Sequence, residues 1–325
     1  MKNRLTMNLQ NFTVDTIDRT GAEALIPEQI SREIIQGVVE QSAVFSMGRR
    51  LPNMTSNRTV MPVLDMLPVA YFVNGDSGTK QTTKMAWDKK KIYAEEIAVI
   101  VPIPEAVVDD ADYDIWGEVR PRLIEAFGQK VDGAILFGAE KPDSWRDDIL
   151  TTATAAGAVV PETADIYKDI MGTDGIIAKI EKSGFFPTGH MADISLRAKL
   201  RELRDNNGNP IFKADMQSGT NYSLDGNRME FPRNGAFDSA KALMISGDFN
   251  QLVYSIRQDI TFKIFDQGVI QDPSTGEIVY NLMQNDMVAL RAVMRLGWEI
   301  PNPINAMAKD KTKRCPFAVY KPKTV

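Results

Sequence analysis

Apolar residues recur with two different periods along the chain, and these periods predict its helices and strands. Between residues 114 and 137 they return every three or four positions, which predicts a long amphipathic helix. Pro121 is discordant, and it predicts either a kink or a start nearer Val119. The apolar stripe consists of Ile115, Val119, Leu123, Phe127, Val131, Ala134 and Ile135.

The segment before this helix is a continuous apolar run, residues 97–103, which predicts a strand. Acidic residues crowd the stretch between strand and helix. Asp112 or Asp114 can cap the helix, and the other acids meet the positive end of its dipole. The acidic residues are Glu105, Asp109, Asp110, Asp112, Asp114 and Glu118.

Residues 57–95 have the pattern of a long β-hairpin. Residues 60–64 and 69–73 are strand-like, and Asn74-Gly75 is a strong turn dipeptide. A two-stranded ribbon is marginally stable on its own, so this hairpin is expected to lie on a partner subunit. Its basic residues are Lys80, Lys84, Lys89, Lys90 and Lys91.

The remaining pattern predicts a mixed α+β fold with segregated strands rather than alternating βαβ units. A helix is expected to open at Pro27 and close at Met47-Gly48. Residues 286–298 form a strand or a helix from their apolar pattern alone, and the tail after Pro301 is basic and irregular. Further expectations are a loop or short strand pair at 139–164, helices at 165–182 and 194–204, and strands at 242–246, 251–256 and 260–265.

Composition narrows the function classes. The 325 residues carry a formal net charge of −5, so basic residues do not dominate as they do in most proteins that coat nucleic acid. One cysteine, Cys315, excludes an internal disulfide and indicates a reducing compartment. No apolar run approaches the ~18 residues of a membrane helix, and the N-terminus lacks a signal-peptide core. We therefore expect a cytosolic protein where it is made.

The motifs that suggest chemistry fail on their spacing. Gly75-Asp76-Ser77-Gly78 resembles a nucleophile segment, but His190 is the only histidine and the segment sits at a hairpin tip. The same tip lacks the spacing of a phosphate loop. Asp110, Asp112 and Asp114 begin like a calcium loop, yet Ile115 and Pro121 stand where glycine and glutamate are required. No catalytic, cofactor-binding or metal-binding residue is predicted.

Several segments, taken in order, resemble the major capsid proteins of tailed bacteriophages, which have the Hong Kong 97 capsid fold. Each motif alone is weak, but their order and spacing extend over about 300 residues. The matching segments are Ile26-Pro27-Glu28, the hairpin at 57–95, residues 101–110, residues 132–138 at the end of the long helix, residues 200–210, residues 223–229, residues 246–249 and residues 285–292.

The resemblance implies a division of the chain and favours a strand at 286–298. The implied parts are an N-terminal arm (1–25), a first helix of the peripheral region (26–50), an extended β-hairpin loop (51–95), a peripheral domain with a long spine helix (96–144), an apical domain (145–285), and a return to the peripheral domain with a C-terminal tail (286–325).

The implied function is structural. Such subunits assemble with copies of themselves, as hexamers and pentamers, into an icosahedral shell around double-stranded DNA, in the host bacterial cytoplasm. Further partners that the resemblance implies are a separate scaffolding protein, a portal and decoration proteins. No membrane association and no sequence-specific binding of DNA are expected. The alternative is an encapsulin-like shell of a bacterial nanocompartment, which the arm before Pro27 disfavours. A hydrolase with paired acids and a divalent metal is a third reading, and nothing in the sequence places such a pair.

Two hypotheses about assembly follow. The basic limb of the hairpin lies on the acidic start of a neighbour's spine helix, because the two segments carry opposite charge. Residues 1–24 become ordered only on assembly. The residues proposed for the contact are Lys80, Lys84, Lys89, Lys90, Lys91, Asp109, Asp110, Asp112 and Asp114.

Overall fold

The structure is a computed structural model, and it describes residues 42–70, 72, 80, 82–106, 115–204, 207, 223–272 and 274–323. These residues fall into two compact units. The described residues of unit 1 lie within Ile97–Leu123 and Asp259–Met294. Those of unit 2 lie within Ile35–Glu96, Ile124–Gln258 and Arg295–Val325.

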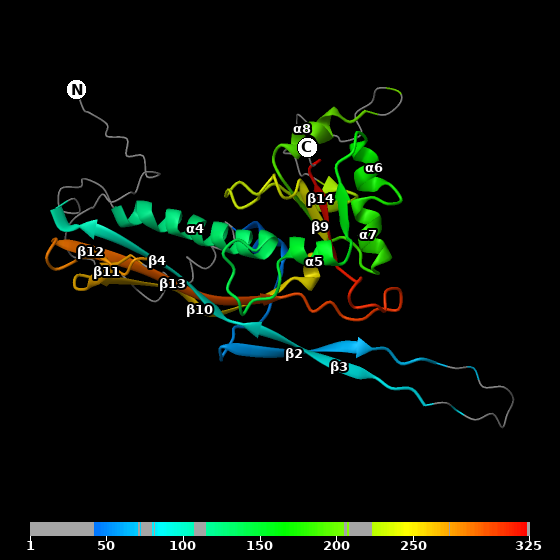
Figure 1. Cartoon of the computed structure of the whole chain (residues 1–325), viewed down its shortest axis with the longest axis horizontal. Helices are drawn as coiled ribbons and strands as arrows, with labels where there is room; N and C mark the ends of the chain where they lie inside the picture. The colour runs from blue at the N-terminus through cyan, green and yellow to red at the C-terminus, as the bar shows by residue number, and fades with distance from the viewer. Residues whose placement is uncertain are drawn as a thin grey trace. The chain divides into compact units, whose positions relative to one another are not determined.

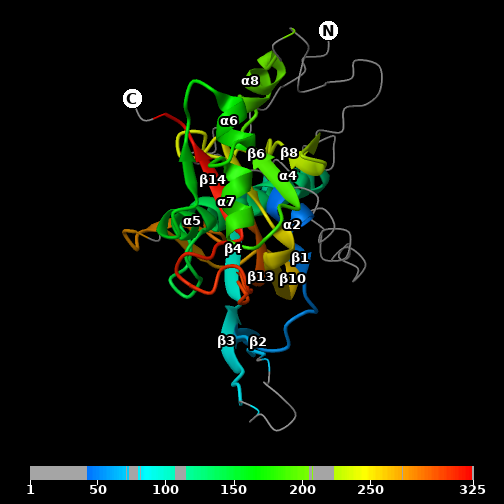
Figure 2. The same cartoon turned by 90° about the vertical axis from the view of Figure 1, so that its right-hand side faces the viewer.

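Unit 2 contains a six-stranded mixed sheet whose order is β5-β14-β9-β6-β8-β7. Its central strands are almost fully buried, and β14 pairs antiparallel with β9 and parallel with β5. Helices α5 and α7 contact β14, and α6 and α7 follow one another beside this sheet (Figures 1 and 2). The bounds are β5 Val159–Pro161, β6 Gly189–Ala192, β7 Ser223–Leu224, β8 Asn227–Glu230, β9 Met244–Gly247, β14 Phe317–Lys321, α5 Ile149–Ala155, α6 Ile166–Met171, α7 Ile176–Lys182 and α8 Leu196–Glu202.

A second sheet has the order β1-β10-β13-β4, and three of its strands have residues in both units. Strand β13 is buried along most of its length, and its side chains are apolar on both faces apart from Arg291, Arg295 and Glu299. The strand expected at 286–298 is therefore confirmed. The bounds are β1 Arg49–Arg50, β4 Glu95–Pro104, β10 Val253–Phe265 and β13 Met287–Glu299, with a 3₁₀ turn η3 at Phe249–Gln251.

Unit 1 ends in a small hairpin formed by β11 (Val269–Gln271) and β12 (Ile278–Asn281). Its apolar cluster is built from Leu282, Met287 and Ala289, against which Phe265, Ile270 and Tyr280 pack.

The long helix is α4, Ile115–Phe137, and it confirms the helix expected at 114–137. Its start does not move to Val119: Pro121 lies inside the helix, in the second turn, where it removes only the hydrogen bond to the Gly117 carbonyl. The buried residues of the apolar stripe of α4 that belong to unit 1 are Val119 and Leu123. Those that belong to unit 2 are Phe127, Val131, Ala134 and Ile135.

Three expectations about unit 2 were wrong. Residues 139–164 contain helix α5, which Asp148 caps by accepting a hydrogen bond from the Thr151 amide. The single helix expected at 165–182 is two helices, α6 and α7, because the chain turns between Gly172 and Gly175. A Cβ on Gly172 would lie 2.4 Å from the Lys168 carbonyl oxygen, so only glycine fits there. The tail after Pro301 is not uniformly irregular, since β14 lies inside the six-stranded sheet.

A buried carboxylate fixes the short helix α2 (Ala43–Met47) to α4 within unit 2. Asp132 of α4 accepts hydrogen bonds from the Ser42 hydroxyl at 2.5 Å and from the amides of Ala43 and Val44 at 3.0 and 3.3 Å. The Asn234 side chain donates a fourth, at 2.7 Å. Asp132 thereby supplies an acceptor for the amides that the start of α2 leaves without helical partners.

The buried environment of Asp132 raises the pKa of its carboxyl group. Burial raises the pKa of the Asp132 carboxyl to about 6, although the hydrogen bonds from Ser42, Asn234 and the two amides act in the opposite direction. The closing glycine of α2 and the stacking of Phe45 on Tyr254, with ring centroids 4.3 Å apart, complete the attachment of this helix.

Replacing Asp132 by alanine should lower the free energy of unfolding by about 2–3 kcal/mol at pH 7, because buried donors lose their acceptor. The raised pKa means that the folded chain binds a proton at Asp132 more tightly than the unfolded chain, whose value is about 3.9. The wild-type chain should therefore gain stability relative to Asp132→Ala as the pH falls from 7 through 6 toward 4. Urea denaturation of both chains at pH 7 and pH 5 measures this.

The matched control is Asp143→Ala, which removes an exposed carboxylate of the same unit. It should change the free energy of unfolding by less than about 0.5 kcal/mol. A difference between wild type and Asp132→Ala that shrinks toward pH 5 would contradict the raised pKa.

Candidate functional site

The hairpin expected at 57–95 is present as an antiparallel ribbon of β2 (Arg58–Met66) and β3 (Ala86–Tyr93). Its register runs from Arg58 opposite Tyr93 to Met66 opposite Ala86. The strand expected at 69–73 is absent from its described residues, because Val69 and Phe72 are exposed and have no surface to pack against. The turn expected at Asn74-Gly75 lies outside the described residues.

Strand alternation gives the ribbon two faces with different character. The Trp87 face consists of Val60, Pro62, Leu64, Trp87, Lys89 and Lys91. The Val63 face consists of Thr59, Met61, Val63, Asp65, Asp88, Lys90 and Ile92.

The Trp87 face is both apolar and basic, and it is open to solvent. The Trp87 residue is 64% exposed and Val60 is 44% exposed, next to exposed Lys89 and Lys91. Sequence reasoning noted the lysines but not the tryptophan. The sequence spacing could have indicated it, because Trp87, Lys89 and Lys91 follow one another at intervals of two residues and therefore share one face of a strand.

The structure distributes the five predicted lysines over more than one surface. Lys89 and Lys91 lie on the Trp87 face, Lys90 lies on the Val63 face, and Lys80 and Lys84 are exposed outside the strands. Among the described residues, none of the five makes an ion pair. Their charges are therefore available for a partner.

The predicted acidic side of the contact lies outside the described residues. This applies to Asp109, Asp110, Asp112 and Asp114 alike. The pairing of these acids with the hairpin lysines stays a prediction.

The base of the ribbon is anchored in unit 2 by an apolar cluster. Met54, Ile92, Ala94 and Val253 form its buried part, and Leu51 and Met61 pack against it.

The end of β3 is also fixed at its backbone. The indole N–H of Trp145 donates a hydrogen bond to the Tyr93 carbonyl at 3.1 Å. A Cβ on Gly297 would lie 2.3 Å from the same carbonyl oxygen, so glycine is required where β13 passes β3. The free part of the ribbon therefore extends from a rigid base.

The segment that resembles a nucleophile motif, residues 75–78, lies outside the described residues, whereas His190 and Cys315 are described and buried. His190 lies in β6 and is fully buried, with Nδ1 2.8 Å from the Ser246 hydroxyl and Nε2 3.1 Å from the Leu224 carbonyl. Burial lowers the pKa of His190 to about 4, so the ring is neutral at pH 7. The Cys315 thiol is buried too, which raises its pKa and keeps it protonated.

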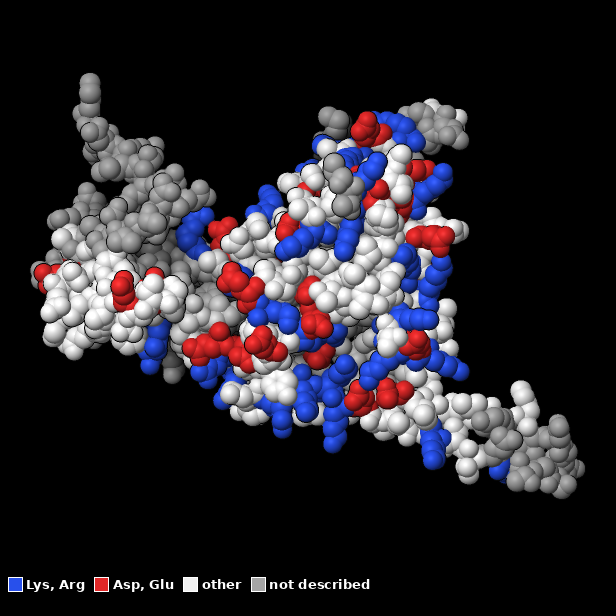
Figure 3. Space-filling view, viewed as in Figure 1, with Lys and Arg blue, Asp and Glu red and all other residues white. Residues whose placement is uncertain are grey.

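Other site types are not found in the described part of the chain. No group of three or more His, Cys, Asp or Glu residues there is placed to hold a metal ion. No described helix is long and apolar enough to cross a membrane. On the face drawn in Figure 3, Lys and Arg side chains lie interspersed with Asp and Glu side chains over the described surface.

Comparison with known proteins gives one consistent answer. Residues 22–309 match the model of the Phage capsid family. The major capsid protein of Staphylococcus phage 80alpha is 24% identical over 313 residues, which cover 91% of each chain.

Solved structures agree with this match. The chain from Microbacterium phage Oxtober96 has a TM-score of 0.75 and 32% identity, covering 87% of this chain and 91% of that one. The chain from Mycobacterium phage Adephagia has a TM-score of 0.74 and 30% identity, covering 96% of this chain and 99% of that one.

These matches confirm the expected fold, the mixed α+β Hong Kong 97-like capsid fold. They also favour a phage capsid protein over the encapsulin-like alternative, since the relatives named above come from phages. The family model covers most of the chain. The chain therefore belongs to the phage capsid family, as a major capsid protein.

Proposed function

We propose that the chain assembles with copies of itself, as hexamers and pentamers, into an icosahedral shell that encloses the double-stranded DNA of a phage. The Trp87 face is the observation that carries the proposal. It exposes an aromatic ring and unpaired lysines on a ribbon that extends from a rigid base. Exposed apolar patches rimmed by charge mark protein–protein contact sites.

The chemistry of the Trp87 face selects its partner. A surface with a tryptophan and two free cations is complementary to one that is apolar and acidic. In this sequence, such a surface is expected at the start of the spine helix, where Asp109, Asp110, Asp112 and Asp114 follow the apolar residues 97–103. We assign the contact to the spine helix of a neighbouring copy.

The energetics suit a repeated contact rather than a tight pair. An exposed ion pair contributes only about 0.2–1 kcal/mol. Burying the exposed Trp87 and Val60 adds an apolar contribution of about 25 cal/mol per Å². Many copies of one weak contact fix the register of a shell while leaving each step of assembly reversible.

The remaining parts receive proposed roles from the family. Residues 1–25 act as an arm, and residues 51–95 act as the extended loop. The peripheral region consists of residues 26–50, 96–144 and 286–325. The apical domain consists of residues 145–285. The chain is a component of the virion, assembled in the host bacterial cytoplasm with a separate scaffolding protein, a portal and decoration proteins. It encloses DNA without reading its sequence, consistent with the net charge of −5.

Reversing Asp109 and Asp110 to lysine should strongly reduce the yield of closed shells, because the hairpin lysines would then meet like charge. Electron microscopy and sedimentation of the expressed protein measure the yield. Adding Lys89→Glu and Lys91→Glu to the reversed chain should recover part of it.

The matched control reverses two exposed acids of unit 2, Asp143→Lys with Glu181→Lys, and should assemble as the wild type does. Normal shells from the Asp109→Lys, Asp110→Lys variant would rule out the proposed charge contact.

Trp87→Ser should reduce shell formation by at least about tenfold while leaving the subunit folded, since the side chain is already exposed. Trp87→Phe keeps an aromatic ring and should assemble nearly normally. Circular dichroism establishes folding, and sedimentation measures assembly. Equal assembly of Trp87→Ser and wild type would remove the Trp87 face from the contact.

The arm at residues 1–24, which lies outside the described residues, should be cleaved first when unassembled chains meet trypsin, and protected in shells. Lys2, Arg4 and Arg19 are the trypsin sites within it. Mass spectrometry of timed digests follows its loss. Equal cleavage rates in both states would contradict ordering of the arm on assembly.

A further inference from the structure

The loop at residues 302–314 of unit 2 is held in shape by a buried arginine. Arg314 is 2% exposed, and its guanidinium donates hydrogen bonds to the side chain and the carbonyl of Asn302 at 3.1 and 3.0 Å. It also donates to the Ala308 carbonyl at 2.9 Å. The Asn302 amide donates in return to the Arg314 carbonyl at 2.7 Å. These bonds close the loop and make it a rigid support.

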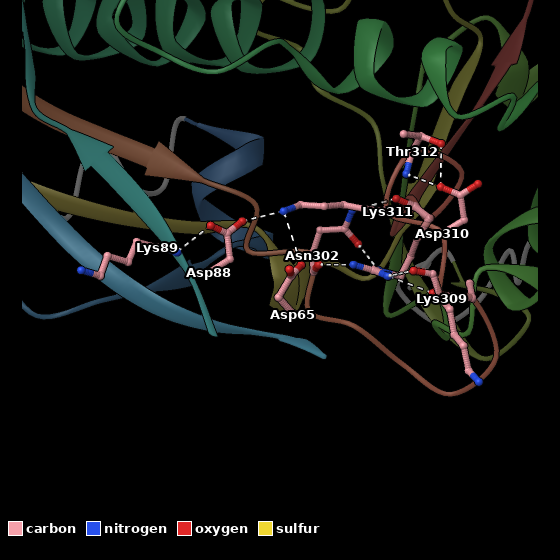
Figure 4. Close-up of polar contacts among 10 residues, drawn as sticks. Asp65, Asp88, Lys89, Asn302, Lys309, Asp310, Lys311 and Thr312 are labelled. Atoms are coloured by element: carbon pink, nitrogen blue, oxygen red, sulfur yellow. Dashed lines mark hydrogen bonds and ion pairs between the residues drawn. The ribbon is translucent and has the colours of Figure 1, made fainter. Parts of the chain in front are cut away.

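Lys311 extends from this loop to both strands of the ribbon (Figure 4). Its ammonium lies 2.6 Å from the Asp88 carboxylate in β3 and 3.5 Å from the Asp65 carboxylate in β2. Alongside it, the Ile304 amide donates a hydrogen bond to the Leu64 carbonyl at 3.1 Å. One short loop therefore holds both strands.

The point of attachment is where the ribbon is least regular. The register of β2 and β3 shifts between Leu64 and Met66, and Asp65 lies at that shift. An irregularity in a ladder bends a strand and weakens its pairing locally. Without an external support, the ribbon would be free to bend here.

The attachment uses the Val63 face and leaves the opposite face free. Asp65 and Asp88 point to the same side as Val63, whereas Trp87, Lys89 and Lys91 lie on the other side. The support therefore does not compete with the face proposed to meet a neighbouring copy.

The ion pairs are partly open to water. The side chains of Lys311, Asp65 and Asp88 are 51%, 44% and 38% exposed. The Lys311 contact lowers the pKa of the Asp88 carboxyl, and both acids raise the pKa of the Lys311 ammonium. Exposed pairs of this kind are weak and screened by salt, so the attachment can open without unfolding unit 2.

We propose that Lys311 is a positioning residue, which sets the direction in which the β2–β3 ribbon leaves unit 2 by joining Asp65 and Asp88 to the 302–314 loop. Its role in assembly rests on the proposed function of the Trp87 face. Its effect on the ribbon does not, and the two are measured separately.

The direct reporter is the Ile304 amide, whose acceptor is on the ribbon. Hydrogen–deuterium exchange on the purified full-length chain should show a faster exchange of this amide in Lys311→Ala, by about two- to fivefold. The amides of the β2–β3 ladder should keep their rates, since their partners lie within the ribbon. In wild type, 1 M salt should produce the same increase, because the screening length falls to about 3 Å. In Lys311→Ala it should add nothing.

Lys309→Ala is the matched control, since Lys309 belongs to the same loop and its side chain points away from the two acids (Figure 4). Its ammonium makes no ion pair within the described residues. The control should leave Ile304 exchange unchanged. Equal exchange in Lys311→Ala and Lys309→Ala would overturn the proposal.

Charge exchange tests the geometry. Lys311→Glu should accelerate Ile304 exchange more than Lys311→Ala, because it faces two carboxylates, and the double variant Lys311→Glu, Asp88→Lys should recover part of the loss. Absence of recovery would count against the Lys311–Asp88 contact.

Assembly is the second readout. Lys311→Glu should lower the yield of closed shells or produce misshapen ones, whereas Lys309→Glu should not. Normal shells from Lys311→Glu would overturn the role of Lys311 in assembly. Normal assembly of Trp87→Ser would instead contradict the proposed contact role of the Trp87 face, and this result is independent of the Lys311 variants.

Discussion

A two-stranded ribbon buries too little apolar surface to be stable by itself in water. The contacts around β2 and β3 depend on this constraint. The base of the ribbon is embedded in the cluster of Met54, Ile92, Ala94 and Val253. Its middle is tied to the 302–314 loop, and its Trp87 face remains exposed. Each part of the ribbon thus finds support within unit 2 or offers a surface for support from elsewhere.

Three buried polar groups of unit 2 hold parts of the fold together. Asp132 accepts four hydrogen bonds and joins α2 to α4. His190 is neutral and bonded on both ring nitrogens, and Arg314 closes a loop. Buried groups that are fully paired specify one arrangement of a core, and such a core gives a shell subunit a fixed shape.

Rigid and adjustable contacts are separated in the chain. The attachment of α2 is buried and that of the end of β3 is partly buried, so opening either one costs more than opening an exposed contact. The Lys311 contacts are exposed ion pairs, so salt screens them, and the Trp87 face is exposed as well. The chain thus combines buried attachments, which stay fixed, with exposed contacts, which can adjust.

Elements with a local signal could be predicted from the sequence alone. The apolar stripe of α4 and the hairpin strand at 60–64 follow from periodicity. The pattern left 286–298 open between strand and helix, and the order of weak motifs pointed to the family and, through it, to the strand β13. The pattern misled for residues 139–164, where α5 is short and carries three threonines, and for the tail, where β14 follows a basic stretch. Two contacts could be known only from the fold: Asp132 caps a helix some ninety residues away in the chain, and Lys311 meets Asp88 across 223 positions. Periodicity reports which face of an element is buried, whereas the partner of a buried or charged side chain depends on how distant segments pack.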